Sequence, residues 1–201
     1  MTVDVVIPTC KALGDIARLL YDVRSTMRSG GLVILTCLQA SAAVNRNAAL
    51  NASEADVVVM IDDDISNFPV AWDVTLANTL EAMPECVMVS ARLMTPRNKP
   101  GLMLGHPPQL LEGQLWEVPS RELPTACIAI RRNELRFDEE FVGSGWEDTC
   151  YCAQLRQRYP DGKFIINSHV KVVHHNEMKN QGGDIFEKNK AHYISKWGPP
   201  R

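Results

Sequence analysis

Short runs of apolar residues alternate with helix-like segments along the first half of the chain. The runs at 3–8, 32–38, 56–61 and 86–94 contain few polar residues, so they lack the alternation of a strand with one solvated face. A strand without that alternation is buried on both sides, and helices must then cover both faces of its sheet. We therefore expect an α/β fold with a Rossmann-like, mostly parallel central sheet and helices on both faces.

The segments between and after these runs divide into helices, strands and one long loop. Apolar residues recur at helical spacing after the first run, and Val70, Trp72, Leu76 and Leu80 predict a helix after the third. Residues 95–124 hold six of the twelve prolines and show little periodicity, which predicts a loop. Beyond it the pattern predicts two further strands and two further helices, in the order 125–132 (strand), 146–159 (helix), 163–175 (strand) and 182–198 (helix).

Composition limits the classes of partner and compartment. The net charge is −3, with 5 Lys+Arg and 11 Asp+Glu in residues 1–91 but 16 and 13 in residues 92–201, so any attraction to an anion belongs to the second half. No apolar run reaches the length needed to cross a bilayer, and no signal sequence is apparent, which predicts a cytoplasmic protein. Cys37, Cys86 and Cys127 fall in apolar runs and are expected to be buried thiols.

Three consecutive carboxylates, Asp62, Asp63 and Asp64, follow the third apolar run directly. In an open α/β sheet, ligands bind beyond the carboxyl ends of the strands, which is where these residues stand. Because side chains alternate along an extended chain, Asp62 and Asp64 are expected to share one direction and Asp63 to take the other. Close carboxylates raise one another's pKa unless a cation such as Mg²⁺ or Mn²⁺ neutralises them. The stretch indicates a divalent metal site, with a solvated acidic turn as the alternative.

Two later segments carry further reactive groups. In GSGWEDTC, Glu147 and Asp148 open a helix after a glycine loop, so one of them is either a general base at the rim of a site or a helix-capping charge. In VKVVHHNE, His174 and His175 end a strand and are either metal ligands or core residues. Cys150 and Cys152 form a C-x-C pair near these histidines in sequence, for which a zinc site is an alternative to burial.

Together these segments resemble the GT-A fold of nucleotide-sugar glycosyltransferases. The closest likeness is to the large inverting family that includes cellulose, chitin and hyaluronan synthases and bacterial polysaccharide transferases. VDVVIPTC (3–10) resembles that family's opening strand, SAAVNRNAAL (41–50) its Arg-Asn helix, VVVMIDDDI (57–65) its strand ending in the DxD motif, and 125–156 its long block ending in WED and a helix. The likeness covers nearly the whole chain outside 95–124.

The resemblance implies one GT-A domain over residues 1–201. Within it, 1–94 would be the half that binds the nucleotide-sugar donor, 95–124 a Pro-rich loop, and 125–201 the acceptor and catalytic half. The loop is expected to fold over a substrate, with His106 and Trp116 as contacts.

The resemblance also assigns roles position by position. Asp148 would be the catalytic base, with Glu147 as second choice. Asp64, Asp62 and His174 would bind Mn²⁺ or Mg²⁺, with His175 as the alternative histidine. The residues implied to bind the nucleotide sugar are Pro8, Thr9, Cys10, Arg46, Asn47, Asp62, Asp63, Gly145 and Trp146.

The implied function is a metal-dependent inverting hexosyl transfer from a nucleoside-diphosphate sugar, with UDP as the expected nucleotide, to an acceptor hydroxyl. The acceptor would be a glycan, a lipid-linked sugar, a small molecule or modified DNA. Two departures bear on this. The run at 32–38 lacks the acidic residues that commonly contact the base, which weakens the case for uracil, and Cys150 replaces an acid that often follows the ED pair.

Three alternatives remain. The first is a DNA-modifying glycosyltransferase acting on a hydroxymethylated base, as small GT-A enzymes of viral origin do. The basic surplus of the second half, which includes Arg131, Arg132, Arg156 and Arg158, would then face phosphate. The second is a nucleotidyltransferase, although PTCKALGD offers only one Gly and one Lys for a phosphate loop. The third is a nucleotide-sugar binding module without transfer.

Overall fold

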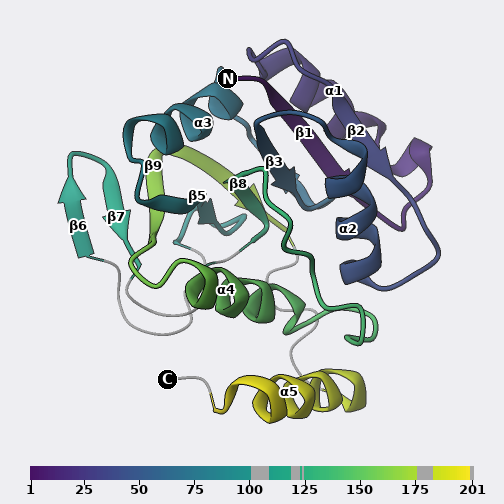
Figure 1. The fold of residues 1–201 in the computed structure, drawn as a ribbon. Coiled ribbons are helices and arrows are strands. Elements are labelled where there is room, and N and C mark those ends of the chain that lie inside the picture. Colours follow the sequence, from purple (N-terminus) through teal and green to yellow (C-terminus); the bar gives the residue numbers. More distant parts are fainter. Residues whose placement is uncertain (101–108, 119–122, 124, 176–182, 200–201) are drawn as a thin grey trace.

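The computed structural model describes residues 1–100, 109–118, 123, 125–175 and 183–199, and side chains are not described at 109–112. A nine-stranded sheet runs through the centre of this described part (Figure 1). Along one path its strands are β2 (Val33–Thr36), β1 (Val3–Pro8), β3 (Val57–Ile61), β8 (Cys127–Arg131), β5 (Cys86–Met94), β9 (Lys163–His174), β7 (Leu115–Glu117) and β6 (Gln109–Glu112), while β4 (Ile65–Ser66) pairs with β9 off this path.

The expected mostly parallel sheet is confirmed. β1 is parallel to both β2 and β3, and β5 is parallel to β9. β8 lies between β3 and β5 and is antiparallel to each, so β3 and β5 run in the same direction. The strands β2, β1, β3, β5 and β9 therefore share one direction, and their carboxyl ends meet at one edge.

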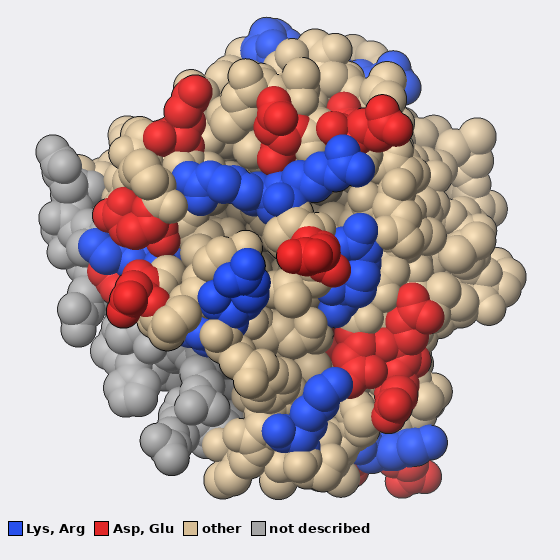
Figure 2. Space-filling view, in the orientation of Figure 1, with Lys and Arg blue, Asp and Glu red and all other residues tan. Residues whose placement is uncertain are grey.

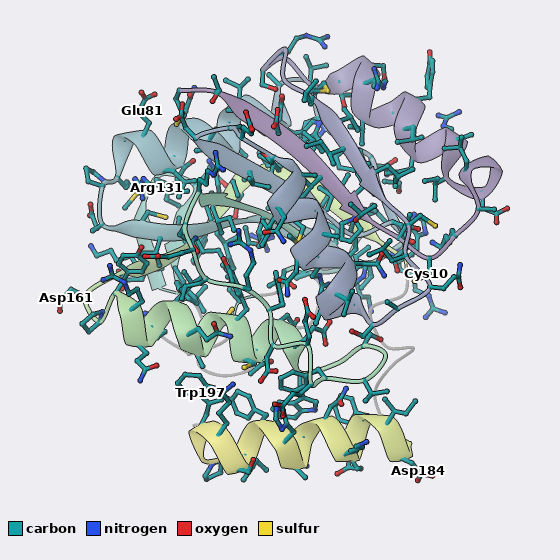
Figure 3. The ribbon with its side chains drawn as sticks, turned by 45° about the vertical axis from the view of Figure 1, so that its right-hand side comes forward. Cys10, Glu81, Arg131, Asp161, Asp184 and Trp197 are labelled. Carbon is teal, nitrogen blue, oxygen red and sulfur yellow. The ribbon has the colours of Figure 1, made fainter. Side chains whose placement is uncertain are left out.

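Helices cover both faces of the sheet. One core cluster joins α1 (Ala17–Thr26) and α3 (Trp72–Ala82) to one face, and a second joins α2 (Ala42–Ala52) and α4 (Glu147–Arg158) to the other. A short 3-10 turn, η1 (Leu13–Ile16), leads into α1. The C-terminal helix α5 (Asp184–Trp197) lies outside α4, and Figure 3 shows Trp197 pointing from α5 toward it.

The two clusters explain the unalternated strands. In β3, Val57, Val59 and Ile61 pack into the α1/α3 cluster, whereas Val58 and Met60 pack into the α2/α4 cluster. Every residue of this strand is buried. Both faces must therefore be apolar, as the sequence predicted.

Several local predictions are wrong. Val70 was expected in the helix, but it precedes α3 and is exposed. Cys37 was expected to be buried, but it lies past the end of β2 and is exposed, because β2 is an edge strand that is only partly buried. Cys86 and Cys127 are buried as expected.

Within the expected loop, β6 and β7 form a hairpin, and β7 pairs with β9. That pairing is a long-range contact, which local periodicity does not reveal. His106 lies outside the described residues. Among the described helices, none is both long enough and apolar enough to cross a bilayer.

Candidate active site

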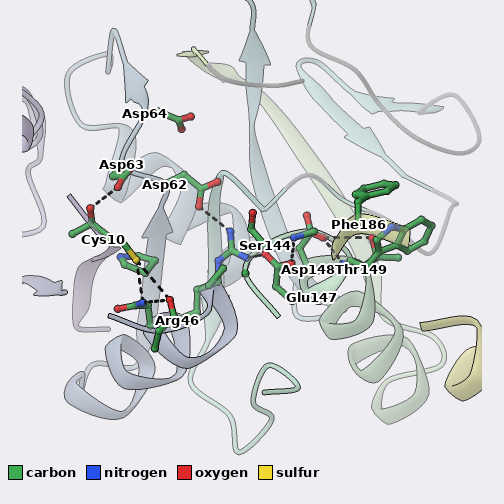
Figure 4. A pocket seen from close by; sticks show the side chains of 18 of the residues that line it. Cys10, Arg46, Asp62, Asp63, Asp64, Ser144, Glu147, Asp148, Thr149 and Phe186 are labelled. Carbon is green, nitrogen blue, oxygen red and sulfur yellow. Dashed lines mark hydrogen bonds and ion pairs between the residues drawn. The ribbon is translucent and has the colours of Figure 1, made fainter. Parts of the chain in front are cut away.

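A pocket of about 550 Å³ opens at the carboxyl edge of β1 and β3 (Figure 4). The end of β9 and the N-terminus of α4 complete its wall. The pocket is lined by Pro8, Thr9, Cys10, Ala40, Ala42, Asn45, Arg46, Asp62, Asp63, Asp64, Gly143, Ser144, Gly145, Trp146, Glu147, Asp148, Thr149, His174 and Phe186. It brings together the three reactive segments that the sequence singled out, DDD, GSGWED and the first histidine of VVHH.

Asp62, Asp64 and His174 form one cluster of potential metal ligands, the metal-binding cluster. Each offers one ligand atom, and these atoms all lie within 4.8 Å of one another. The Nε2 atom of His174 is 3.3 Å from Oδ1 of Asp64. His175 is exposed, and its Nε2 lies 2.7 Å from the hydroxyl of Ser66. Of the two histidines, His174 therefore belongs to the cluster and His175 is turned away from it.

Asp63 takes a different direction from its two neighbours. Its carboxylate accepts a hydrogen bond from Thr9 and pairs with Lys11, whose Nζ is 2.7 Å from Oδ1. The same Nζ donates to the backbone oxygen of Asp63 at 3.0 Å. Asp63 thus ties the turn after β3 to the loop after β1, and Asp62 and Asp64 are left to line the cluster.

Arg46 connects the metal-binding cluster to the start of α4. Its Nη2 is 3.0 Å from Oδ1 of Asp62 and its Nη1 is 2.5 Å from Oε1 of Glu147 (Figure 4). Only 6% of Arg46 is exposed. Burial lowers the pKa of Arg46, but the charges of Asp62 and Glu147 outweigh that effect and raise it. The guanidinium is therefore a fixed positive charge between the two sides of the pocket.

Burial also acts on the two carboxylates that Arg46 holds. It raises the pKa of Asp62, against the opposing charge of Arg46, and it raises the pKa of Glu147 in the same way. Glu147 is 3% exposed, and its second oxygen accepts the amide of Gly145 at 2.5 Å. Both of its oxygens are therefore engaged, which fits a structural role better than that of a base.

Asp148 is the more accessible member of the Glu-Asp pair. Its Oδ1 accepts the amide of Thr149 at 2.8 Å, and its Oδ2 is 3.4 Å from the hydroxyl of Thr125. The carboxylate stands in the first turn of α4, where the partial positive charge of the helix favours an anion. A carboxylate on the pocket wall with one weakly held oxygen can accept a proton from a bound hydroxyl.

The glycine loop before α4 is held by α5. Asn189 accepts the amide of Val142 and donates to the backbone oxygens of Val142 and Gly145. Trp146 has a φ of 73° at the helix start, and its ring packs against Phe186 and Tyr193. Gly145 has a φ of 105°, which favours glycine over any other residue.

Pro8, Thr9 and Cys10 line the opposite end of the pocket, next to Asn45. Asn45 is buried, and its side chain accepts the amide of Leu38 and donates to the backbone oxygens of Leu38, Ala40 and Ser41. It thereby shapes the loop that faces Cys10.

Seven residues that line the pocket were not among the predicted site residues: Ala40, Ala42, Asn45, Gly143, Ser144, Thr149 and Phe186. Asn45 directly precedes Arg46 and Asn47 in the sequence, and this position next to two predicted site residues was a signal that could have identified it. Gly143, Ser144 and Thr149 lie within the segment GSGWEDTC that the sequence singled out, whereas Phe186 had no comparable local signal.

Asn47 was expected at the nucleotide, but it does not line the pocket. Its side chain donates to the backbone oxygen of Phe137 and to Glu139. It also accepts the amide of Phe137 at 2.8 Å. Asn47 therefore fastens α2 to the segment before the glycine loop.

Comparison with known proteins identifies the fold. No family model matches the chain, and no curated protein matches it in sequence. Among solved structures, GalNAc-T7 with UDP, GalNAc and Mn²⁺ superimposes on 98% of this chain and 48% of its own, with 12% identity and a TM-score of 0.74. The fold of these residues is thus shared with glycosyltransferases. The chain has the GT-A fold.

Two further GT-A structures are similar over the same length. Glucosyl-3-phosphoglycerate synthase from Mycobacterium tuberculosis, with Mg²⁺ and UDP, matches 100% of this chain and 80% of its own, at 16% identity and a TM-score of 0.65. TarS from S. aureus matches 98% of this chain and 39% of its own, at 13% identity and a TM-score of 0.58. The chain spans about half or less of the length of GalNAc-T7 and TarS.

Other predicted contacts of the GT-A chain lie away from the pocket. Trp116 packs at the edge of the α2/α4 cluster instead of lining the pocket. Cys150 accepts the indole N–H of Trp197, whereas Cys152 faces the α2/α4 cluster and donates to the oxygen of Leu123. The two thiols thus point to different sides of α4, so the zinc alternative is wrong for the described residues.

The arginines that suggested a phosphate-bearing acceptor are largely used within the fold. Arg131 donates to the backbone oxygens of Leu80 and Cys86, and Arg132 to that of Glu54. Arg156 donates to two backbone oxygens and stacks on a phenylalanine ring, while Arg158 lies over Tyr159. On the face shown in Figure 2, positive and negative side chains are interspersed. This distribution does not favour a nucleic-acid surface there.

Proposed function

We propose that this chain is a metal-dependent, inverting glycosyltransferase that moves a hexose from a UDP-sugar to an acceptor hydroxyl. The observation that carries the proposal is the single pocket in which Asp62, Asp64 and His174 converge on one side and Asp148 stands on another. One wall can hold the charge of a diphosphate through a cation, and the other presents a base.

The donor set fits a divalent cation such as Mn²⁺ or Mg²⁺. Two carboxylates and one imidazole within 4.8 Å are ligands that Mn²⁺ accepts, and Mg²⁺ commonly takes one or two carboxylates with phosphate oxygens completing its shell. When bound there, the cation would neutralise the charge that develops on the departing diphosphate. GalNAc-T7 with Mn²⁺ and UDP, and glucosyl-3-phosphoglycerate synthase with Mg²⁺ and UDP, support this choice of metal and nucleotide.

In the proposed reaction, the oxygen of the acceptor hydroxyl attacks the anomeric carbon from the face opposite the diphosphate, which leaves. Asp148 accepts the proton of that hydroxyl during the attack. The glycine loop permits that approach, because Gly143 and Gly145 line the pocket beside Asp148 without side chains. Glu147 holds the loop and does not take the proton. Holding donor and acceptor in line would supply a large part of the acceleration.

The first experiment is a screen of nucleotide sugars for Mn²⁺-dependent hydrolysis by the purified chain. The matched comparison is the same reaction with EDTA. We expect one UDP-sugar to be hydrolysed with metal and not with EDTA. Hydrolysis that is indifferent to EDTA would contradict the role given to Asp62, Asp64 and His174, and failure to turn over any nucleotide sugar would contradict the proposal itself.

The second experiment identifies the acceptor and the stereochemistry. Candidate hydroxyl acceptors include glycans, lipid-linked sugars, small molecules and hydroxymethylated DNA. Proton NMR of the first product formed from an α-linked donor would report the anomeric configuration. A β-linked product supports inversion, and an α-linked product overturns it.

A further inference from the structure

Arg46 forms ion pairs to both sides of the pocket. It forms one pair with Asp62, in the metal-binding cluster, and one with Glu147, at the start of α4. Glu147 in turn accepts the amide of Gly145, in the loop beside Asp148. A continuous chain of polar contacts therefore runs from the metal-binding cluster to the glycine loop.

We propose that Arg46 is a positioning residue that couples the metal and donor side of the pocket to the acceptor side by sharing its charge between Asp62 and Glu147. The inference rests on the proposed function, since it concerns the same pocket. It assigns Arg46 a role different from direct contact with the nucleotide.

The geometry favours a shared charge over a simple surface contact. The guanidinium is almost fully buried and stacks over the ring of Phe137 at 5.3 Å, so it is held in one orientation. Its planar fork presents separate N–H groups to the two carboxylates, an arrangement that a lysine cannot reproduce. Removing one carboxylate from such a buried set leaves a larger share of the charge of Arg46 directed at the other.

The sharing has a definite consequence for metal affinity. In the wild type, the carboxylate of Glu147 offsets part of the positive charge of Arg46. Arg46 therefore competes less strongly with a cation for Asp62. In Glu147→Gln a larger share of that charge acts on Asp62, so Mn²⁺ affinity should fall. In Arg46→Gln the competing charge is gone, so Mn²⁺ affinity should rise. Opposite shifts from two residues in contact distinguish coupling from general damage.

The test measures Mn²⁺ binding to the ligand-free full chain by the electron paramagnetic resonance signal of free Mn²⁺. We expect Glu147→Gln to raise the Kd by about threefold or more and Arg46→Gln to lower it by about threefold, which is the scale of coupling between contacting residues. In the Arg46→Gln background, Glu147→Gln should change the Kd by less than about twofold.

The control is Glu139→Gln, because Glu139 accepts a hydrogen bond from Asn47, the neighbour of Arg46 on α2, and lies outside the pocket lining. It should leave the Kd unchanged. Thermal melting of every variant verifies folding, and the Arg46→Gln/Glu147→Gln variant removes both charges of the buried Arg46–Glu147 pair if a single variant fails to fold. Arg46→Lys, which keeps the charge but loses the planar fork that reaches both carboxylates, should lie between wild type and Glu147→Gln.

The outcomes separate this inference from the proposed function. If wild type binds Mn²⁺ and the effect of Glu147→Gln is equal with and without Arg46, the coupling is overturned and the metal site stands. If wild type binds no Mn²⁺, the proposed metal dependence falls, and the coupling to metal falls with it. Equal weakening by Glu147→Gln and Arg46→Gln would also overturn the inference, since it requires opposite signs.

Discussion

Asp64 and His174 lie in opposite halves of the chain, yet Oδ1 of the first is 3.3 Å from Nε2 of the second. The antiparallel pairing of β4 with β9 brings them together, with Ile65 opposite His174 in the register. The turn between β3 and β4, which carries Asp64, is therefore fixed against the end of β9. The cluster that includes Asp62 depends on this pairing.

His174→Ala should weaken Mn²⁺ binding by more than about tenfold, since loss of supporting contacts alone costs metal sites that much. His175→Ala is the matched control, because its ring contacts Ser66 outside the cluster. Titration of Mn²⁺ against each variant provides the measurement. An equal loss in both would mean that the register at the end of β9 does not select the ligand.

Asp64→Ala should abolish metal-dependent donor hydrolysis, whereas Asp63→Asn should retain a measurable rate. Asp63 pairs with Lys11 and Thr9, so its loss loosens the turn without removing a cluster ligand. Initial rates with saturating Mn²⁺ are the appropriate comparison. If the two variants lose the same activity, the alternation of the three aspartates has no functional meaning.

Asp148→Asn should lower kcat for transfer by about 10²- to 10⁴-fold, the usual contribution of a general base. Binding of UDP with Mn²⁺ should be nearly unchanged, because Asp148 is not in the metal-binding cluster. Single-turnover transfer and calorimetric UDP binding measure the two quantities separately. Wild-type transfer by this variant would exclude Asp148 as the base.

The contact between Asp138 and α5 should make the helix sensitive to acid. Burial would raise the pKa of Asp138, but hydrogen bonds from Lys196 and His192 outweigh it and lower the pKa to about 2. Glu140 also faces His192. Because the folded pKa is depressed, the stabilisation is present above the ordinary pKa of about 4 and is lost as the pH falls toward 2.

Asp138→Asn should therefore lower the melting temperature at pH 7, and its effect should shrink as the pH falls from about 4 toward 2, because the stabilisation by the ionised wild-type carboxylate is then lost. Melting curves of wild type and variant from pH 7 to 2.5 would test this. A gap between the two that persists unchanged at the lowest pH would show that the ionised form is not responsible.

The buried strands and the aspartate alternation could be predicted because both are local. VVVMI contains no polar residue, and consecutive side chains in DDD must diverge. The direction of β8 could not be predicted, since a buried antiparallel strand and a buried parallel one have the same apolar pattern. The β6–β7 hairpin likewise depends on pairing with β9.

The candidate site was predicted less completely than the fold. The carboxylates and the pair His174 and His175 stood out because their residue types carry chemistry at strand and helix ends, and the resemblance to the GT-A family selected His174. The bridge from Arg46 to Glu147 joins α2 to α4, so no local pattern reveals it. The same is true of the contact between Phe186 and the glycine loop, which depends on how α5 packs.

The position of β8 also has a consequence for how the chain reaches its native state. β3 and β5 are not neighbours, because β8 fills the space between them with residues that come more than thirty positions after β5. A nascent chain that ends near residue 94 would thus leave one edge of β3 and both edges of β5 unpaired, and unpaired strand edges are sites of aggregation. β3 and β5 can be joined into one sheet only once residues 127–131, which form β8, have been synthesised. Folding is therefore expected to be late and cooperative across the whole domain. A boundary at residue 94 would therefore separate the proposed donor-binding half from the rest of the chain, but it would not mark an independently folding unit.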